Sequence, residues 1–533
     1  MIGAGTATTD RIDASDPSGA WFGVGLALLA GGIVRILPML VTDFPLNDGG
    51  LFGTMTQDLV DNGFLLPAYT TYNRLDIPFA YPPLAFYIAG IANQAFGIPI
   101  LDTLRAVPLL LSMATIPAMY WLANGLLGSR SGAVLAVVAF ALLPRGYLWM
   151  ITGGGITRAL GFLLAIVALG IAWRLLRSPE HRWWTAGMLG LVGGLTVLAH
   201  PQAGVFMAAS ILVFLPWAHG WRPAGMRVLV AGLIGLVVVI PWLVAIVGRH
   251  GLDPLLAAVS TGGGMAEGIL LLLSFRFTEL PVFDIIGIGA IVGAVVALGR
   301  RDVMLPIWLA VIWIVDSRAG WTFSMVPVAM LAAYLLQSLR SDWLPVAGAS
   351  PIADVRRHPW WALGVPAVLI GLIMANYLSG LSPSSPLHAV SVDHRSAMEW
   401  AGEQTGADAT FAVVTGSRIW QIDAVSEWFP VLSGGRSVAT VQGYEWVGSE
   451  DWTRQQEAYG DLQICARDAL SCVVAWSVEY GTPVTHVFLP KDRLHGPLSD
   501  LDCCAAPRHS VELVPGARVV YDGPGATIIE LPP

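Results

Sequence analysis

Two carboxylates in the segment 43–50 are the first candidates for chemistry. Asp43 and Asp48 belong to the sequence Asp-Phe-Pro-Leu-Asn-Asp-Gly-Gly, which directly follows the apolar run 21–41. A carboxylate that is partly desolvated at a membrane surface can have its pKa raised toward the working pH of a general base. The alternative is that Asp48 only caps the amphipathic helix expected at 51–60. We expect Asp48, and after it Asp43, to be catalytic.

Three arginines next to apolar runs are candidates for binding a phosphate group. They are Arg158 in Gly-Gly-Gly-Ile-Thr-Arg, Arg276 in Leu-Ser-Phe-Arg-Phe and Arg318 in Asp-Ser-Arg-Ala-Gly. The planar guanidinium group binds phosphate through two charge-assisted hydrogen bonds. Simpler roles are also open, because Arg318 can pair with Asp316 and Arg276 can extend to the membrane interface.

Four further polar residues are expected to bind substrate. His200 and Gln202 flank a proline at the end of an apolar run, Glu267 lies in the glycine-rich segment 260–268, and Tyr81 precedes two prolines. Glu267 could complete a metal site with Asp48. However, the segment 145–158 contains no Asp or Glu, and no HxxH or CxxC spacing predicts zinc. The metal ligands are therefore unknown, and a divalent cation such as Mg²⁺ or Mn²⁺ stays open.

The composition shows what must position these residues. Of the 533 residues 55% are hydrophobic and 12% are charged, against about 25% charged in soluble domains. The chain is therefore not a soluble globular protein. Residues 1–20 form a polar tail without the basic region of a signal peptide, so the first apolar run is expected to stay as an anchor. About eleven runs have the length of membrane helices: 21–41, 106–127, 131–149, 156–174, 184–199, 202–218, 227–248, 281–299, 303–317, 320–338 and 360–380.

The apolar run 81–97 decides the topology of the later spans. If it does not cross the membrane, twelve arginines lie on the cytoplasmic side and seven outside; if it crosses, the numbers are reversed. The positive-inside rule favours the first arrangement. We therefore expect 81–97 to be interfacial or re-entrant within one long external loop, 43–105. The N-terminus is then cytoplasmic, and the C-terminal part of the chain is exoplasmic.

The region 386–533 has the pattern of a separate domain after the linker 382–386. Its net charge is −10, and it holds all four cysteines. An acidic domain without a basic stripe argues against nucleic acid as a partner. Alternation of short strands with helical stretches predicts an α/β domain whose mainly parallel sheet ends in an antiparallel meander. The expected strands are 410–414, 437–441, 472–476, 485–489, 511–514, 518–521 and 527–531.

These features together resemble the C-type (GT-C) integral membrane glycosyltransferases, which include protein O-mannosyltransferases, aminoarabinose transferases and oligosaccharyltransferase catalytic subunits. The matching residues are the acidic segment 43–50, the helix after it, the Tyr81-Pro-Pro-Leu segment, and the run Ser-Glu-Trp-Phe-Pro at 426–430 followed by Arg436. The resemblance implies a GT-C-like membrane domain at 21–385 and an exoplasmic α/β domain at 386–533.

The resemblance also implies the reaction. A sugar moves from a polyprenyl-phosphate carrier to a glycan, lipid or protein acceptor on the outer face, with Asp48 as base or metal ligand and arginines on the departing phosphate. The near absence of lysine indicates a prokaryote, and hence a multi-pass protein of the plasma membrane that acts on the cell envelope. A polytopic transporter or lipid flippase with an extracellular domain is the alternative. It is disfavoured because no internal repeat is visible and most charges lie at span ends.

Overall fold

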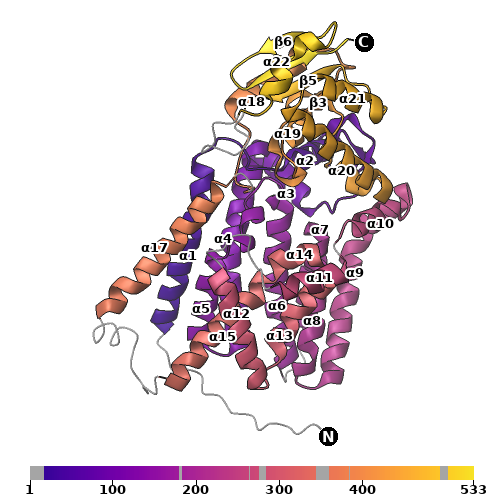
Figure 1. The fold of residues 1–533 in the computed structure, drawn as a ribbon. Helices are drawn as coiled ribbons and strands as arrows, with labels where there is room; N and C mark the ends of the chain where they lie inside the picture. The colour runs from indigo at the N-terminus through magenta and orange to yellow at the C-terminus, as the bar shows by residue number, and fades with distance from the viewer. Residues whose placement is uncertain are drawn as a thin grey trace.

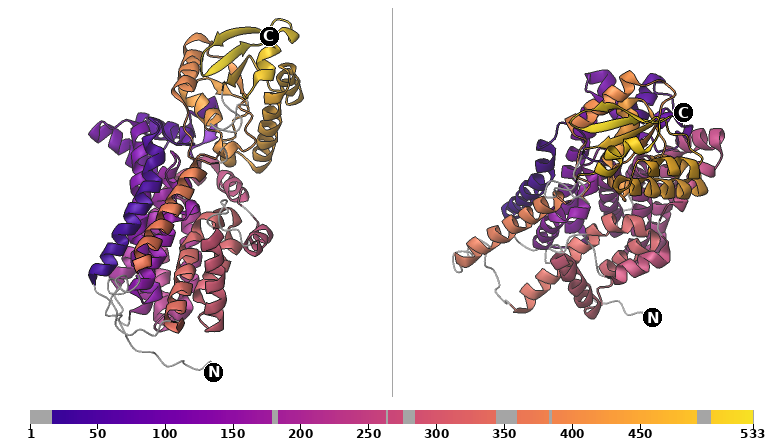
Figure 2. Two further views of the ribbon diagram at one scale, coloured as in Figure 1. Left: turned by 60° about the vertical axis from the view of Figure 1, so that its left-hand side comes forward. Right: turned by 45° about the horizontal axis from the view of Figure 1, so that its top comes forward.

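The computed structural model describes residues 17–178, 183–262, 264–274, 284–343, 359–382, 385–491 and 502–532. A bundle of long helices carries an α/β domain at one end (Figures 1 and 2). The first helix, α1 (Pro17–Leu40), begins at the end of the bundle opposite to this domain (Figure 1).

Among the described residues, five helical segments are long and apolar enough to cross a membrane. Two bent helix pairs raise the number of candidate spans to seven. Several of the other predicted spans form shorter apolar helices, so the count of eleven stays a prediction. The five candidates are α1, α4 (Ile100–Leu127), α6 (Gly155–Arg177), α9 (Trp221–His250) and the segment Asp253–Leu273, which contains α10 (Asp253–Ser260) and α11 (Met265–Leu273). The shorter helices are α7 (Trp183–Ala199), α8 (Pro201–Phe214), α12 (Asp284–Gly299) and α13 (Met304–Val315), and α17 (Pro359–Gly380) runs beside α1.

The expectation of one continuous span over 131–149 is wrong. Helix α5 (Arg130–Leu142) ends before Pro144, and the chain then turns by 87°. Leu143 has an extended backbone, as proline imposes on the residue before it. The predicted span 320–338 is also broken, with a bend of 48° between α14 (Ser317–Phe323) and α15 (Met325–Trp343).

The loop between α1 and α4 lies at the domain end of the bundle (Figure 1). It contains α2 (Gly50–Asp61), a short hairpin of β1 (Tyr69–Thr70) and β2 (Ile77–Pro78), and α3 (Leu84–Phe96). The 13 residues of α3 rise by about 20 Å, less than the roughly 30 Å of a membrane core. Helices α8 and α13, which remain predicted spans, are about as short, so the location of 81–97 in an external loop stays a prediction.

The C-terminal domain contains a mixed five-stranded sheet in the order β4-β3-β5-β7-β6. The pairs β3–β4 and β3–β5 are parallel, and β5–β7 and β6–β7 are antiparallel. The strands are β3 (Thr410–Val413), β4 (Arg436–Ser437), β5 (His486–Pro490), β6 (Arg518–Asp522) and β7 (Ala526–Glu530). The helices are α18 (Val392–Gln404), α19 (Ala424–Ser433), α20 (Ser449–Ile464), α21 (Ser471–Glu479) and α22 (Ala505–His509).

Two of the expected strands are not strands. The segment 472–476 lies in α21, where Val473 and Trp476 are both buried. Their spacing of three residues places both side chains on one face of a helix, and this packing overrides the strand preference of the valines. The segment 511–514 forms a 3₁₀ turn, Val511–Leu513.

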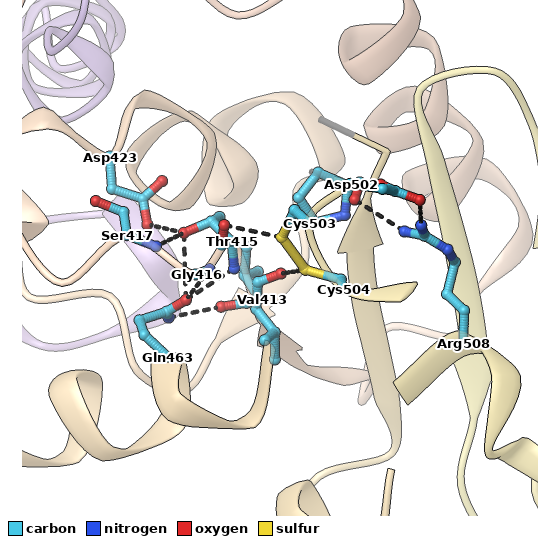
Figure 3. The surroundings of a disulfide bond; sticks show 12 residues. Val413, Thr415, Gly416, Ser417, Asp423, Gln463, Asp502, Cys503, Cys504 and Arg508 are labelled. Carbon is cyan, nitrogen blue, oxygen red and sulfur yellow. Dashed lines mark hydrogen bonds and ion pairs between the residues drawn. A yellow bond between two sulfur atoms is a disulfide. The ribbon is translucent and has the colours of Figure 1, made fainter. Parts of the chain in front are cut away.

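The C-terminal domain contains two disulfides, and a polar network beside one of them reaches the start of α19. The disulfides are Cys465–Cys472 and Cys503–Cys504. Beside the second one (Figure 3), Thr415 donates its hydroxyl hydrogen to Asp423 Oδ2 at 2.6 Å. Asp423 in turn caps α19 by accepting a hydrogen bond from Ser426 N at 3.1 Å. The start of α19 is therefore fixed to the sheet of the domain.

One hydrophobic cluster spans the domain and the bundle. Phe44 and Ile156 of the membrane part belong to the same buried cluster as Trp428 and Phe488 of the domain. The rings of Phe44 and Trp428 meet edge to face with centroids 4.7 Å apart. Packing is therefore continuous across the boundary that the sequence predicts near residue 386.

Candidate active site

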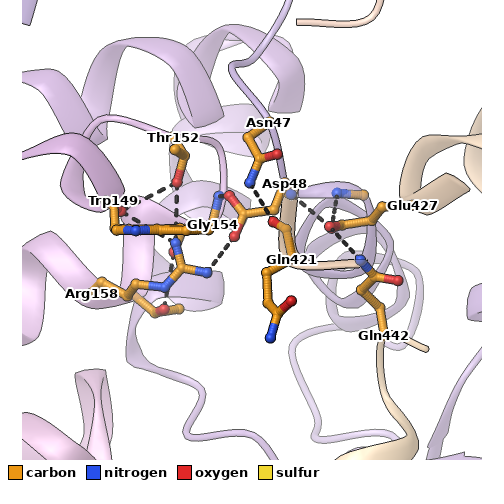
Figure 4. Close-up of polar contacts among 12 residues, drawn as sticks. Asn47, Asp48, Trp149, Thr152, Gly154, Arg158, Gln421, Glu427 and Gln442 are labelled. Carbon is orange, nitrogen blue, oxygen red and sulfur yellow. Dashed lines mark hydrogen bonds and ion pairs between the residues drawn. The ribbon is translucent and has the colours of Figure 1, made fainter. Parts of the chain in front are cut away.

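Asp48 is buried where the first loop meets the start of α6. Its Oδ1 accepts a hydrogen bond from Gly154 N at 2.9 Å, and its Oδ2 forms an ion pair with Arg158 Nη2 (Figure 4). Gly154 is the N-cap residue of α6, and a carboxylate is stabilised at the positive end of a helix dipole. Asp48 does not cap α2, as the simpler interpretation expected, because the N-cap residue of α2 is Gly49 and no side chain caps it.

Arg158 is itself fixed by the segment before α6. Its Nη1 donates to Trp149 O at 3.2 Å and to Thr152 Oγ1 at 3.1 Å. The guanidinium also lies 5.4 Å from the ring centroid of Trp149. The side chain is therefore positioned before any ligand binds.

Glycines allow the two chain segments to approach this closely. A Cβ atom on Gly153 would lie 2.1 Å from Asp48 O, and one on Gly154 would lie 2.6 Å from Asp48 Oδ2. Gly49 has a φ of 128°, which a residue with a side chain rarely adopts. The three consecutive glycines at 153–155 were expected only as neighbours of Arg158; the structure shows that the first two leave the space that Asp48 occupies.

Glu427 of α19 is a second buried carboxylate, on the other side of Asp48 from Arg158 (Figure 4). Its Oε1 accepts hydrogen bonds from Gly49 N at 2.8 Å and Gly50 N at 3.0 Å, and Gln442 Nε2 donates to its Oε2 at 3.1 Å. Burial, together with the negative charge of Asp48, raises the pKa of Glu427 to about 8. Glu427 thus holds the loop that carries Asp48.

Sequence reasoning did not select Glu427 as a site residue. It is the only charged residue in the otherwise apolar run 424–432. A carboxylate in such a run is rarely buried without a partner, so its position was a usable signal. Its backbone partners Gly49 and Gly50, however, lie more than 370 residues away in the chain.

Tyr81, His200 and Thr157 form a polar group next to this centre. The Tyr81 hydroxyl lies 3.0 Å from His200 Nδ1 and 3.2 Å from Thr157 Oγ1. Thr157 precedes Arg158 in α6, and the Tyr81 ring meets that of Trp446 with centroids 5.6 Å apart. The candidate substrate residues Tyr81 and His200 are therefore brought together.

Arg318 approaches the same centre from α14. Burial raises the pKa of Glu445, whereas the charges of Arg318 and Arg158 both act to lower it. Glu445 is thus within electrostatic reach of both arginines. Arg318 Nη1 donates to Thr261 Oγ1 at 3.2 Å.

The remaining candidates lie around α14 or apart from the centre. Asp316, once considered as a partner for Arg318, caps α14 through Ala319 N at 3.0 Å and accepts a hydrogen bond from Gln202 Nε2 at 3.2 Å. Glu267 accepts a hydrogen bond from Ser317 Oγ at 2.9 Å.

Asp43 is exposed and pairs with Arg395 of α18, so it does not share the centre with Asp48. Arg276 lies outside the described residues.

The described residues do not fit a divalent cation at this centre. Mg²⁺ and similar hard cations need several free oxygen ligands. Both oxygens of Asp48 and both of Glu427 already accept hydrogen bonds, and the cationic guanidinium of Arg158 lies on Asp48. Over the described ranges, no group of three or more His, Cys, Asp or Glu side chains could hold a metal ion.

The sequence matches no protein-family model and no curated protein. The structure, in contrast, is similar to solved membrane glycosyltransferases. The oligosaccharyltransferase AglB of Archaeoglobus fulgidus, in complex with an inhibitory peptide and a dolichol-phosphate, has a TM-score of 0.58 at 14% identity, with 88% of this chain and 69% of that chain covered. Another AglB structure, with a TM-score of 0.51 at 14% identity over 87% of this chain and 67% of that chain, holds Zn and sulfate.

Two other glycosyltransferases match over nearly the whole of this chain. The arabinofuranosyltransferase AftD from Mycobacteria has a TM-score of 0.54 at 14% identity, with 98% of this chain and 40% of that chain covered. ArnT from Cupriavidus metallidurans, in the apo state, has a TM-score of 0.50 at 14% identity, with 96% of this chain and 98% of that chain covered. At these identities the similarity establishes the fold, and the protein has the fold of the GT-C membrane glycosyltransferases.

Proposed function

We propose that the protein is a membrane glycosyltransferase that moves a sugar from a polyprenyl-phosphate carrier to an acceptor on the outer face of the membrane. The observation that supports this most directly is the buried Asp48, fixed by Gly154 and Arg158 where the bundle meets the C-terminal domain. The fold adds support, and AglB, which shares it, was solved with a dolichol-phosphate. The acceptor is a glycan, a lipid or a protein.

The proposed reaction is a direct displacement at the anomeric carbon of the sugar. Asp48 takes the proton of the acceptor hydroxyl while its oxygen forms the new glycosidic bond. The bond between the anomeric carbon and the phosphate oxygen breaks, and its electron pair leaves with the lipid phosphate. Arg318 and Arg158 stabilise the negative charge that develops there. Attack opposite to the leaving group inverts the anomeric configuration.

The other candidate residues would contact the substrates around this centre. Tyr81 and His200 provide a hydroxyl and an imidazole beside α6, whereas Gln202 and Glu267 lie around α14. Arg276 stays a candidate phosphate ligand from the sequence alone.

In the proposed topology, eleven spans separate a cytoplasmic N-terminus from an exoplasmic domain. The start of α1 and the domain lie at opposite ends of the bundle (Figure 1), which supports an odd number of crossings. Four residues expected outside support this topology: Asp48 pairs with Arg158, and His200 lies within electrostatic reach of Arg158 and Arg318. The centre would then open toward the outer leaflet, where a lipid-linked donor is delivered.

The test is release of the lipid phosphate from a panel of polyprenyl-phosphate sugars by the purified protein with candidate acceptors. Asp48→Asn should lower the rate by about 100-fold to 10,000-fold, the range for loss of a general base. The matched control is Asp43→Asn in the same loop, which should stay within a few-fold of the wild-type rate. Equal rates for wild type and Asp48→Asn would remove Asp48 from its role. No release and no donor binding by the folded wild type would refute the function.

A further inference from the structure

The charge balance at Asp48 differs from that of a metal-binding centre. The carboxylate is buried, and its compensating charge comes from a side chain of this protein, Arg158. The guanidinium group of Arg158 is fixed in position, because Trp149 O and Thr152 Oγ1 accept hydrogen bonds from its Nη1 (Figure 4). The positive charge is therefore a built-in part of the centre.

Arg158 also has unused hydrogen-bonding capacity. A guanidinium group carries five N–H donors. Within the described residues, Nη1 donates to Trp149 and Thr152, and Nη2 donates to Asp48. One N–H on Nε and one on Nη2 remain, and the side chain is 24% exposed. A guanidinium N–H group forms a charge-assisted hydrogen bond with a phosphate oxygen.

We propose that Arg158 is the fixed cation of this centre: it orients Asp48 and binds the departing lipid phosphate through its two remaining donors, so that transfer needs no divalent metal ion. This inference rests on the proposed glycosyl transfer for its phosphate ligand. Its metal part depends on the ion pair that Asp48 forms with Arg158 and on the hydrogen bonds that the oxygens of Asp48 and Glu427 already accept. A divalent cation at Asp48 would have to displace Arg158 and meet its positive charge at close range.

The space around Asp48 supports this assignment. The segment 153–155 approaches Asp48 as bare backbone, and a Cβ on Gly154 would already lie 2.6 Å from Oδ2. An additional acidic side chain therefore has no room at Gly153 or Gly154. Arg158, one helical turn further along α6, is the position from which a side chain reaches Asp48.

The experiment measures Mn²⁺ binding by electron paramagnetic resonance and lipid-phosphate release with EDTA or with added Mn²⁺, using the full-length protein in detergent. Wild type should release lipid phosphate equally under both conditions and bind no Mn²⁺ that depends on Asp48. Arg158→Asp should lose about 100-fold or more of the rate in EDTA. It should also gain Mn²⁺ binding that the further change Asp48→Asn removes.

Arg158→Lys tests whether the positive charge alone is sufficient or the guanidinium geometry is also needed. It also provides a second test if Arg158→Asp does not fold. Lysine keeps one positive charge but lacks the planar fork, so its rate should fall while staying insensitive to EDTA. Wild-type activity that EDTA abolishes and Mn²⁺ restores, or Mn²⁺ binding by wild type that Asp48→Asn abolishes, would overturn the inference. If wild type releases no lipid phosphate at all, the proposed reaction fails, whereas the Mn²⁺ binding still decides whether Arg158 excludes a metal.

Discussion

Asp43 and Asp48 lie five positions apart in one loop, and each forms an ion pair with an arginine. The Asp43 side chain is 67% exposed, whereas that of Asp48 is 9% exposed. Arg395 lowers the pKa of Asp43, mainly through its hydrogen bonds. An exposed pair contributes little because water screens it, whereas removing one partner of a buried pair leaves a costly unpaired charge. Burial, rather than the ion pair itself, therefore distinguishes the candidate active site from the Asp43 pair.

Removal of the carboxylate from each pair should give the largest difference between them, measured as the loss in free energy of unfolding. Asp48→Ala leaves Arg158 without its anionic partner and should lower the free energy of unfolding by about 3–5 kcal/mol. Asp43→Ala should cost about 1 kcal/mol or less. Thermal or denaturant unfolding of both variants in the same detergent measures the difference. Equal losses would contradict the distinction between the two regions.

Crowding the buried pair should reduce activity without removing any charged group. In Gly154→Ala the new Cβ would meet Asp48 Oδ2 at 2.6 Å, so the carboxylate must move. A misplacement of about 1 Å can cost about 100-fold in rate, and we expect a loss of that size in lipid-phosphate release. Gly225→Ala in α9 is the control, because a Cβ there has no atom within 4 Å. A normal rate for Gly154→Ala would show that the position of Asp48 is not critical.

Glu427 extends the buried region into the C-terminal domain and can be tested with a pair of variants. Glu427→Ala leaves the buried N–H groups of Gly49 and Gly50 without an acceptor, at a cost of about 1–3 kcal/mol in stability. Glu427→Gln keeps an oxygen for both groups and should stay close to wild type. Unfolding measurements and transfer rates should both follow this order. Equal behaviour of the two variants would assign Glu427 no positioning role.

The pH dependence of stability should reveal the buried region as well. The pKa of Glu427 rises from 4.5 to about 8 on folding, so between these values the folded state keeps a proton that the unfolded state has lost. Stability from this group therefore falls as pH rises through that window, by at most about 1.4 kcal/mol per pH unit. Comparing Tm against pH for wild type and Glu427→Gln tests this, and the variant should show the shallower slope.

Salt should affect only the exposed pair, and this is the smallest effect expected. At about 1 M salt the Debye length falls to about 3 Å, so the stability difference between wild type and Asp43→Ala should vanish. The difference between wild type and Asp48→Ala should persist, because ions do not enter the buried pair. A salt titration of Tm for the three proteins measures both responses.

Several features of the site were predictable because they depend on local position. Asp48 was selected because it follows an apolar run in a loop assigned to the outer face. Of the residues that the charge argument assigns to the same face, Arg158 pairs with Asp48, and His200 lies within electrostatic reach of Arg158 and Arg318. Glu427 and the tight approach of Gly153 and Gly154 were missed. Their importance arises from contacts between segments that are about 100 to 380 residues apart.

The errors in the C-terminal domain have the same origin. The run 472–476 has the composition of a strand, yet it forms part of α21 because helical spacing buries Val473 and Trp476 together. Strands β3, β5 and β7 agree with expectation and lie inside the sheet, whereas β6, which also agrees, lies at its edge and pairs with its neighbour in the chain, β7. A segment therefore adopts the secondary structure that its own residues prefer only where tertiary packing favours the same structure.

Three features follow from the amino-acid sequence alone: most of the chain is apolar helix, an acidic α/β region follows it, and an acidic loop comes directly after the first helix. Hydropathy and local periodicity fix these features because each depends on neighbours in the chain. Only the tertiary structure decided which aspartate is buried, that an arginine balances its charge, and that Glu427 holds its loop. Those outcomes depend on distance and on exclusion of water, and both arise only when distant segments pack together.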